Sequence, residues 1–154
     1  MLDEYIKLFS GYDGDFGIAD MSKAKLDSER NKLKPDYEWA GRPITPADYK
    51  NHIDGKISIG IQPCRLDKTA QFACIDIDPK NYSEFKVKQY LEKFEQYKLP
   101  LIPLLSKSGG LHCYIFLKEP IPAADLIEAV KAFLLPLELK PNTEIFPKQK
   151  ELKE

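Results

Sequence analysis

The feature that most constrains the fold is the order of strand-like and helix-like patterns after Gln71. QFACIDID has the length and branched side chains of a strand, and SEFKVKQYLEKFEQYK carries apolar residues at helical spacing. The strand patterns LIPLL and HCYIFL, the amphipathic pattern AADLIEAVKAFLL and the short strand pattern TEIF follow in that order. The order β-α-β-β-α-β is typical of a split β-α-β sheet with helices on one face, so we predict an α+β fold.

That order is the one found in RRM-like or ferredoxin-like sheets, which are antiparallel or mixed. The patterns that precede it are weaker. Residues 2–9 predict a short helix, PADYKNHIDG predicts a helix capped by Thr45 and closed by Gly55, and KISIGIQP predicts a strand that ends at Pro63. Residues 20–38 are charged and poor in apolar residues, which indicates a mobile or weakly ordered connection.

Length and composition favour one domain, since 154 residues with 43% hydrophobic content are enough for one core. A formal net charge of −1 creates no global attraction to nucleic acid or membrane, so phosphate binding would need a local cleft. The three cysteines are widely spaced, which argues against a disulfide framework or a zinc site. Without a signal peptide or a long apolar run, we expect a cytoplasmic protein with no membrane partner.

Two acids at the end of a strand pattern are the first candidates for chemistry. Asp76 and Asp78 are two residues apart, so on a strand both carboxylates project from one face. Mg²⁺ or Mn²⁺ suits such a pair, because hard cations prefer carboxylate oxygens. The alternative is that Asp78 caps the following turn while Asp76 is solvated. By the same alternation, Glu144 could reach this surface as a third acid.

The segment between the LIPLL and HCYIFL strands combines hydroxyl, amino and imidazole groups with two glycines: Ser106, Lys107, Ser108, Gly109, Gly110 and His112. Such a turn exposes backbone N–H groups and allows a triphosphate to approach closely. The alternative is an ordinary hairpin loop with a half-buried histidine. Lys148 and Gln149, just past the third acid, could add phosphate or base contacts, although an exposed lysine often serves only solubility.

Aromatic residues of the N-terminal part are candidate platforms for stacking bases: Tyr12, Phe16, Tyr37, Trp39 and Tyr49. Aromatics at this density more often belong to the core. His52 and Arg65 could line a cleft, but their spacing favours structural roles.

Three blocks in order, FACIDID, SKSGGLHCYIF and EIFPKQ, resemble motifs I, II and III of the archaeo-eukaryotic primase superfamily. The signatures of that superfamily are an hhhDhD strand, an SxxxH strand and an acidic third strand. Within the superfamily the chain is similar to the primase-polymerase domains of phages, mobile elements and TOTE conflict systems. In these domains blocks like LFSGYDGDFG and HIDGKISIGIQP precede motif I. The resemblance covers nearly the whole chain apart from residues 20–45.

The resemblance implies roles for individual residues. Asp76, Asp78 and Glu144 match the ligands of a two-metal site for Mg²⁺ or Mn²⁺, while Ser108 and His112 match the residues that hold the phosphates of the incoming nucleotide. Lys107 would assist beside them, and we add Ser106 and Lys148 as nucleotide-binding candidates from their position. The resemblance also implies one catalytic domain over 1–154, with 1–65 as a small N-terminal αβ module and 66–154 as the RRM-like core.

The implied function is metal-dependent, template-directed nucleotidyl transfer from nucleoside triphosphates on single-stranded DNA. Relatives continue past the FPKQ block, so we expect a C-terminal truncation, and a helicase could be a partner in the same chain or operon. The expected source is a prokaryote, phage or mobile element. Two alternatives stay open: a non-catalytic RRM-like module that binds single-stranded nucleic acid, and a metal-dependent nuclease.

Overall fold

The structure is a computed structural model that describes residues 1–20, 25–27, 32–34, 36–107 and 109–152. They form two compact units, Met1–Gln62 and Pro63–Glu154. Among the described residues no helix is long and apolar enough to cross a membrane. The three cysteines are free and buried.

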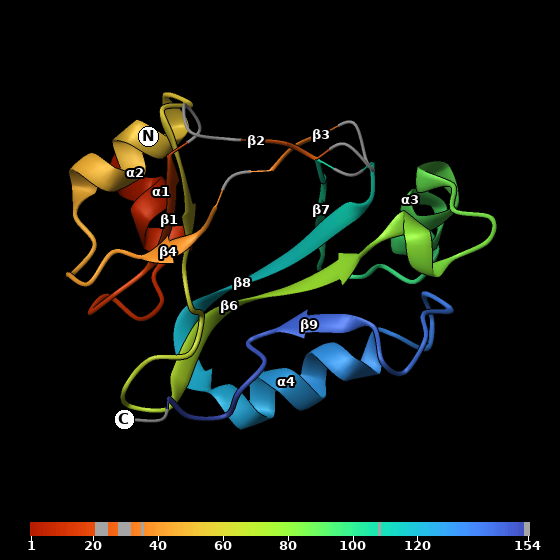
Figure 1. The fold of residues 1–154 in the computed structure, drawn as a ribbon. Coiled ribbons are helices and arrows are strands. Elements are labelled where there is room, and N and C mark those ends of the chain that lie inside the picture. Colours follow the sequence, from red (N-terminus) through yellow and green to blue (C-terminus); the bar gives the residue numbers. More distant parts are fainter. Residues whose placement is uncertain (21–24, 28–31, 35, 108, 153–154) are drawn as a thin grey trace. The chain divides into compact units, whose positions relative to one another are not determined.

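The second unit contains a four-stranded antiparallel sheet in the order β7-β8-β6-β9 (Figure 1). The strands are β6 (Thr69–Ile77), β7 (Ile102–Leu105), β8 (Leu111–Pro122) and β9 (Glu144–Phe146), and the helices are η2 (Pro79–Asn81), α3 (Val87–Gln96) and α4 (Ala123–Ala132). Strand β8 lies between β6 and β7, so β6-α3-β7 is a split β-α-β unit. The predicted element order and the α+β class are confirmed.

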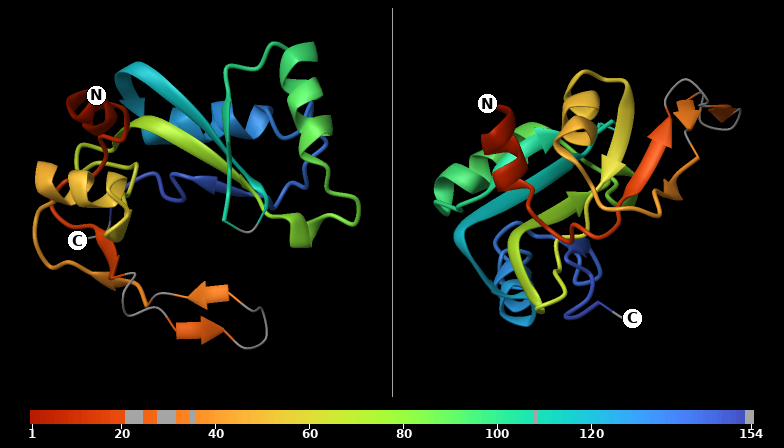
Figure 2. Two further views of the ribbon diagram at one scale, coloured as in Figure 1. Left: turned by 90° about the horizontal axis from the view of Figure 1, so that it is seen from above. Right: turned by 90° about the vertical axis from the view of Figure 1, so that its left-hand side faces the viewer.

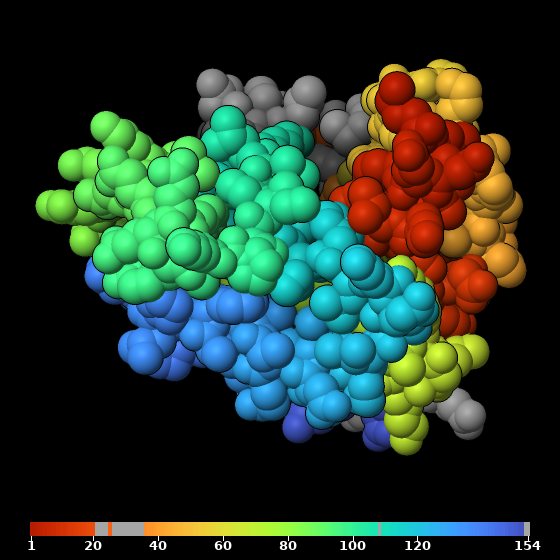
Figure 3. Space-filling view, turned by 180° about the vertical axis from the view of Figure 1, so that it is seen from behind, coloured from red at the N-terminus to blue at the C-terminus, as the bar shows by residue number. Residues whose placement is uncertain are grey.

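The core of the second unit lies on one face of this sheet, and α3 and α4 both pack there (Figure 2). Ile75 and Ile77 of β6 are 0% exposed and belong to one apolar cluster with Phe94 of α3 and Leu126 of α4. Because side chains alternate along a strand, Asp76 points to the opposite face, which we call the site face. Figure 3 shows α3 (green), β7 (teal), β8 (cyan) and α4 (blue) together on one face of this unit.

The first unit has a three-stranded antiparallel sheet in the order β4-β1-β5 and a separate hairpin, β2-β3. Its elements are α1 (Leu2–Leu8), β1 (Gly17–Asp20), β2 (Lys25–Asp27), β3 (Lys32–Lys34), β4 (Glu38–Trp39), α2 (Pro46–Ile53) and β5 (Ile57–Gly60). The two helices and β5 agree with the sequence patterns. The short strands β2 and β3 form inside the segment predicted to be weakly ordered, and β4 begins at its last residue; residues 21–24, 28–31 and 35 of it lie outside the described part.

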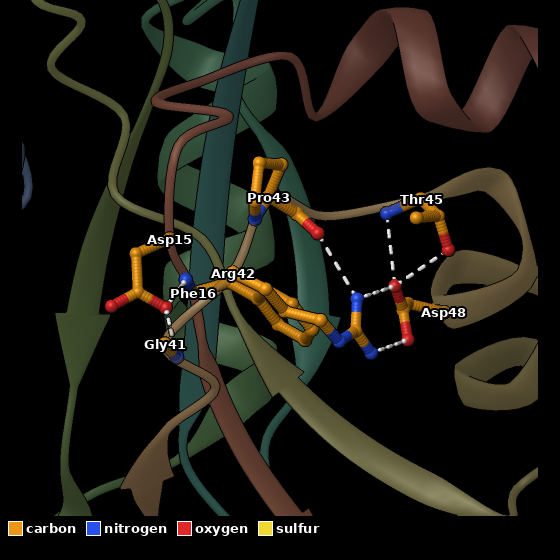
Figure 4. A network of polar contacts seen from close by, with 7 residues as sticks. All are labelled: Asp15, Phe16, Gly41, Arg42, Pro43, Thr45 and Asp48. Carbon is orange, nitrogen blue, oxygen red and sulfur yellow. Dashed lines mark hydrogen bonds and ion pairs between the residues drawn. The ribbon is translucent and has the colours of Figure 1, made fainter.

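The start of α2 is held by a polar network around Asp48 (Figure 4). Asp48 accepts hydrogen bonds from the backbone N–H and hydroxyl of Thr45 at 2.9 and 2.7 Å. Arg42 donates to both carboxylate oxygens at 2.8 and 2.7 Å, and its guanidinium lies 5.2 Å from the centre of the Phe16 ring. The hydrogen bonds from Arg42 hold the pKa of Asp48 well below its usual range.

Exposure separates the candidate stacking residues. Phe16 and Tyr49 are 0% and 5% exposed, which rules out base stacking for these two and agrees with the core placement that the sequence favoured. A ring buried to this extent offers no face to a base. Tyr37 and Trp39 are each 60% exposed. Of the two cleft candidates, His52 contacts the carbonyl oxygen of residue 57 at 3.2 Å, a local structural contact.

The other cleft candidate, Arg65, makes a structural contact in the second unit. Its guanidinium donates to the side-chain oxygen of Gln71 at 2.7 Å. Gln71 in turn donates to the carbonyl oxygen of Leu117 at 3.3 Å, so the contact joins β6 to β8. This geometry agrees with the structural role that its spacing favoured.

Candidate functional site

Three of the candidate site residues form a row across adjacent strands of the second unit. The strand register pairs Asp76 of β6 with His112 of β8 on one side and with Glu144 of β9 on the other. Residues paired directly across antiparallel strands project from the same face. The two acids and the imidazole therefore share the site face, where Asp76 Oδ1 lies 3.6 Å from His112 Nε2.

Asp78 lies just past the end of β6 and has two structural features. Its backbone is extended, with φ −84° and ψ 123°, so it continues the strand alternation that places it on the same face as Asp76. Its Oδ1 also accepts the backbone N–H of Lys80 at 3.1 Å, which caps η2. The turn-capping alternative for Asp78 is therefore observed, and it coexists with the position expected of a ligand.

Two lysines lie beside the acids. The ammonium of Lys80 is 2.6 Å from Asp78 Oδ2, and Lys148 forms a close ion pair with Glu144. Lys148 also lies over the ring of Phe146, 4.9 Å from its centre. The sequence reasoning missed Lys80, although the order Asp-Pro-Lys after the strand is a usable signal. A proline in the first turn of η2 places the next residue close to the capping carboxylate.

The electrostatics of Asp76 differ from those of a simple surface acid. Burial raises the pKa of its carboxyl, and the negative charges of Glu144 and Asp78 raise the pKa further, while His112 opposes the shift. The Asp76 side chain is 27% exposed. A partly buried carboxylate with two acidic neighbours gains from any added cation at this face.

The glycine-rich loop before β8 packs against the end of β6. Ser106 accepts the N–H of Gly110 on its hydroxyl oxygen at 3.0 Å, and the two residues also share a backbone hydrogen bond of 2.9 Å. A Cβ on Gly110 would lie only 2.2 Å from the carbonyl oxygen of Ile77, so no larger residue fits without movement. Gly109 has a φ of +82°, a conformation that favours glycine.

These contacts explain the two glycines by close approach and backbone conformation, and they bring the loop next to the strand end that carries the acids. Ser106 closes the loop through its hydroxyl group. Lys107 lies within the same loop, whereas Ser108 lies outside the described residues. His112 begins the returning strand within the acidic row.

The residue types suit a hard divalent cation, since carboxylate oxygens are the ligands that Mg²⁺ and Mn²⁺ prefer. Among the described residues, however, no group of three or more His, Cys, Asp or Glu side chains is close enough to hold a metal ion. Two of the acids instead bring a lysine ammonium to their oxygens. The donor chemistry fits a metal, and Asp78 and Glu144 each have a lysine ammonium as their present cationic neighbour.

Together, the fold and the site define a class of protein: an α+β domain whose split β-α-β sheet carries acids from adjacent strands on the face opposite its helices. Residues 18–154 match the family described as "TOTE conflict system, Archaeo-Eukaryotic Primase domain". The chain belongs to this family, which confirms the resemblance found in the sequence. A comparison with curated proteins gave no match.

Proposed function

We propose that this chain is a primase-polymerase domain that joins nucleotides by metal-dependent, template-directed nucleotidyl transfer on single-stranded DNA. The observation that carries the proposal is the row of His112, Asp76 and Glu144 across three adjacent strands, in a chain of the archaeo-eukaryotic primase family. Because the two acids are direct partners on neighbouring strands, the sheet fixes the distance between their carboxylates, and phosphoryl transfer requires groups held in fixed positions.

In this proposal Asp76, Asp78 and Glu144 hold the divalent ions. The ions, when bound, lower the pKa of the attacking 3′-hydroxyl and stabilise charge on the leaving pyrophosphate. The chain's own contribution is positional, because the row on β6 and β9 fixes two carboxylates and the cap of η2 fixes the third. The raised pKa of Asp76 supports the proposal, since a carboxyl that is costly to ionise alone gains most from a cation.

The triphosphate would be held by the loop before β8 and by the cations of the site face. The candidates are those named from the sequence: Ser106, Lys107, Ser108, His112 and Lys148. We add Lys80 to them, since it lies beside Asp78 as Lys148 lies beside Glu144. With the acids neutralised by bound cations, the ammonium groups of both lysines would be free to turn toward the phosphate oxygens and donate to them.

The experiment is calorimetric binding of a nonhydrolysable deoxynucleoside triphosphate with and without Mn²⁺. We expect binding by the unmodified protein that requires Mn²⁺ and is lost in Glu144→Gln. The matched control is Glu119→Gln, which removes the same charge from an exposed glutamate of β8 and should bind normally. Binding that survives Glu144→Gln unchanged would contradict the assignment of this acid.

The alternatives give different results in the same samples. A metal-dependent nuclease would degrade single-stranded DNA with Mn²⁺ and would not bind the triphosphate. A non-catalytic nucleic-acid-binding module would bind an oligonucleotide equally well with and without Mn²⁺ and would ignore the triphosphate. Primer extension on a single-stranded template is then the direct assay of the proposed activity.

A further inference from the structure

One face of the sheet in the first unit has a strip without bulky side chains. The strand register aligns Trp39 of β4 with Gly17 of β1, and Gly17 with Gly60 of β5. A Cβ added to Gly60 would meet no atom within 4 Å, so the space above it is open. The indole of Trp39, 60% exposed, therefore stands at the edge of bare backbone that extends over two strands.

Tyr37 is a second exposed aromatic residue on the same face, and its ring is held in place. Its hydroxyl group makes a 2.7 Å hydrogen bond with the hydroxyl of Ser58 on β5. Ser58 pairs with Ala19 of β1, so the tyrosine side chain spans β1 from the β4 side. The Tyr37 side chain is 60% exposed and therefore available to a ligand, whereas Ala19 of the strand beneath it is only 1% exposed. We call Tyr37, Trp39, Gly17, Ser58 and Gly60 the aromatic strip.

The backbone that follows Trp39 is tied to the start of β1. The N–H of Ala40 donates to the carbonyl oxygen of Phe16 at 2.9 Å, and the N–H of Gly41 donates to Asp15 at 2.9 Å (Figure 4). These contacts hold the edge strand against its neighbour. The exposed rings are thus pre-positioned, which lowers the entropy lost when a ligand binds to them.

We propose that the aromatic strip binds single-stranded DNA by stacking unpaired bases on Trp39 and Tyr37. Planar bases fit bare backbone beside exposed rings, and stacking tolerates any base, as a surface for a copied strand requires. In a duplex the base faces are already stacked on one another, so the strip should discriminate against it. The choice of a DNA strand as occupant rests on the proposed function, since a domain that copies a template must hold one.

The side chains of the strip carry no charge, and this sets a second expectation. Binding through phosphate contacts weakens steeply with salt, whereas base stacking does so far less. The part of the affinity that depends on Trp39 should therefore persist as the salt concentration rises. A surface of lysines would show the opposite behaviour.

The chain offers a direct probe, because Trp39 is its single tryptophan. Titration with an oligothymidine should quench the tryptophan fluorescence in a saturable way, and a duplex of the same length should not. Fluorescence anisotropy of a labelled oligothymidine gives the affinity independently. With that probe Trp39→Ala should bind roughly 5- to 100-fold more weakly, the range expected for one lost base stack.

Two further variants protect the test from a folding artefact, with circular dichroism as the check on each. Gly60→Leu keeps Trp39 but fills the open space in the strip, so it should weaken binding and quenching. Tyr37→Phe keeps the ring and loses only the hydrogen bond to Ser58, so it should retain most of the affinity. The matched control is Tyr97→Ala, which removes another exposed tyrosine, 48% exposed, and should change nothing.

The outcomes separate this proposal from the proposed function. Oligothymidine that binds without quenching, and with equal affinity for Trp39→Ala, overturns the strip while the metal-dependent nucleotide site stands. Quenching that saturates in a protein with no Mn²⁺-dependent nucleotide binding supports the strip and overturns the proposed function. Quenching by a proline-rich peptide and not by oligothymidine also overturns the proposal, because the occupant is then a protein.

Discussion

Asp48 in the first unit is buried and Asp76 in the second is partly buried, yet the groups around the two carboxylates differ. Asp48 receives hydrogen bonds from Arg42 and Thr45, and the pKa of its carboxyl is lowered. Burial raises the pKa of the Asp76 carboxyl, the acidic neighbours Glu144 and Asp78 raise it further, and a histidine nitrogen lies at 3.6 Å.

The difference distinguishes a structural acid from a candidate functional one. The partners of Asp48 lie within its own unit and already stabilise its charge, so its ionised form favours folding. The surroundings of Asp76 disfavour its ionised form, so the folded chain gains nothing from that charge by itself. A site that accumulates such charge is a functional candidate, because an external cation can supply the missing stabilisation.

The largest effect is expected from a substitution that removes the charge of Asp76 and keeps its shape. Asp76→Asn should weaken Mn²⁺-dependent nucleotide binding by roughly 100-fold or more, since a ligand should cost at least as much as an outer-shell partner. The free energy of unfolding should not fall, because the amide keeps the shape and removes repulsion from Glu144. Calorimetry and urea unfolding measure the two quantities. A loss of stability together with intact nucleotide binding would make Asp76 a structural acid like Asp48.

The next effect concerns the loop that packs beside the acids. Gly110→Ala places a Cβ against the carbonyl oxygen of Ile77 and should lower the free energy of unfolding by about 1–3 kcal/mol. Gly109→Ala meets open space and should cost about 1 kcal/mol, from its positive φ alone. Urea unfolding followed by far-ultraviolet circular dichroism tests the pair. Equal costs for the two variants would contradict the close contact between the loop and β6.

A smaller effect is expected at the structural acid. Asp48→Asn should destabilise the first unit by about 1–2 kcal/mol, because it weakens the hydrogen bonds at the start of α2 and leaves Arg42 without its charged partner. Hydrogen exchange of peptides from α2 measures this locally. Asp54→Asn is the control, since its ion pairs with Lys50 and Lys56 are exposed and should contribute little. Unchanged exchange in α2 of the Asp48 variant would contradict the structural role.

Much of the second unit could be predicted from local patterns. Period-two alternation in β6 separates Asp76 from Ile75 and Ile77, and helical spacing identifies α3 and α4, because each pattern reflects one buried face. The pairing register between strands cannot be derived from such local patterns. That register sets Asp76 opposite both His112 and Glu144, and it depends on how three separate strands pack together.

The first unit was predicted less well, for physical reasons. Strands β1 and β4 are only four and two residues long, too short for a clear alternation. The exposure of an aromatic residue depends on what packs over it, so Phe16 and Trp39 look alike in the sequence but differ in the structure. Lys80 was missed because its position beside Asp78 follows from the turn that Asp78 caps.

The smallest effect is the pH dependence of the stability that the Asp48 carboxylate contributes. Because the folded-state pKa of Asp48 lies below its value in the unfolded chain, its charge stabilises the fold fully above the unfolded pKa of about 4. That contribution is lost as the pH falls from there toward the lowered folded pKa. The difference in stability between the unmodified protein and Asp48→Asn should therefore be constant from pH 8 to about pH 5 and shrink at pH 3. Urea unfolding across this range measures it, and a difference that stayed constant down to pH 3 would mean that the ionised carboxylate is not what Arg42 stabilises.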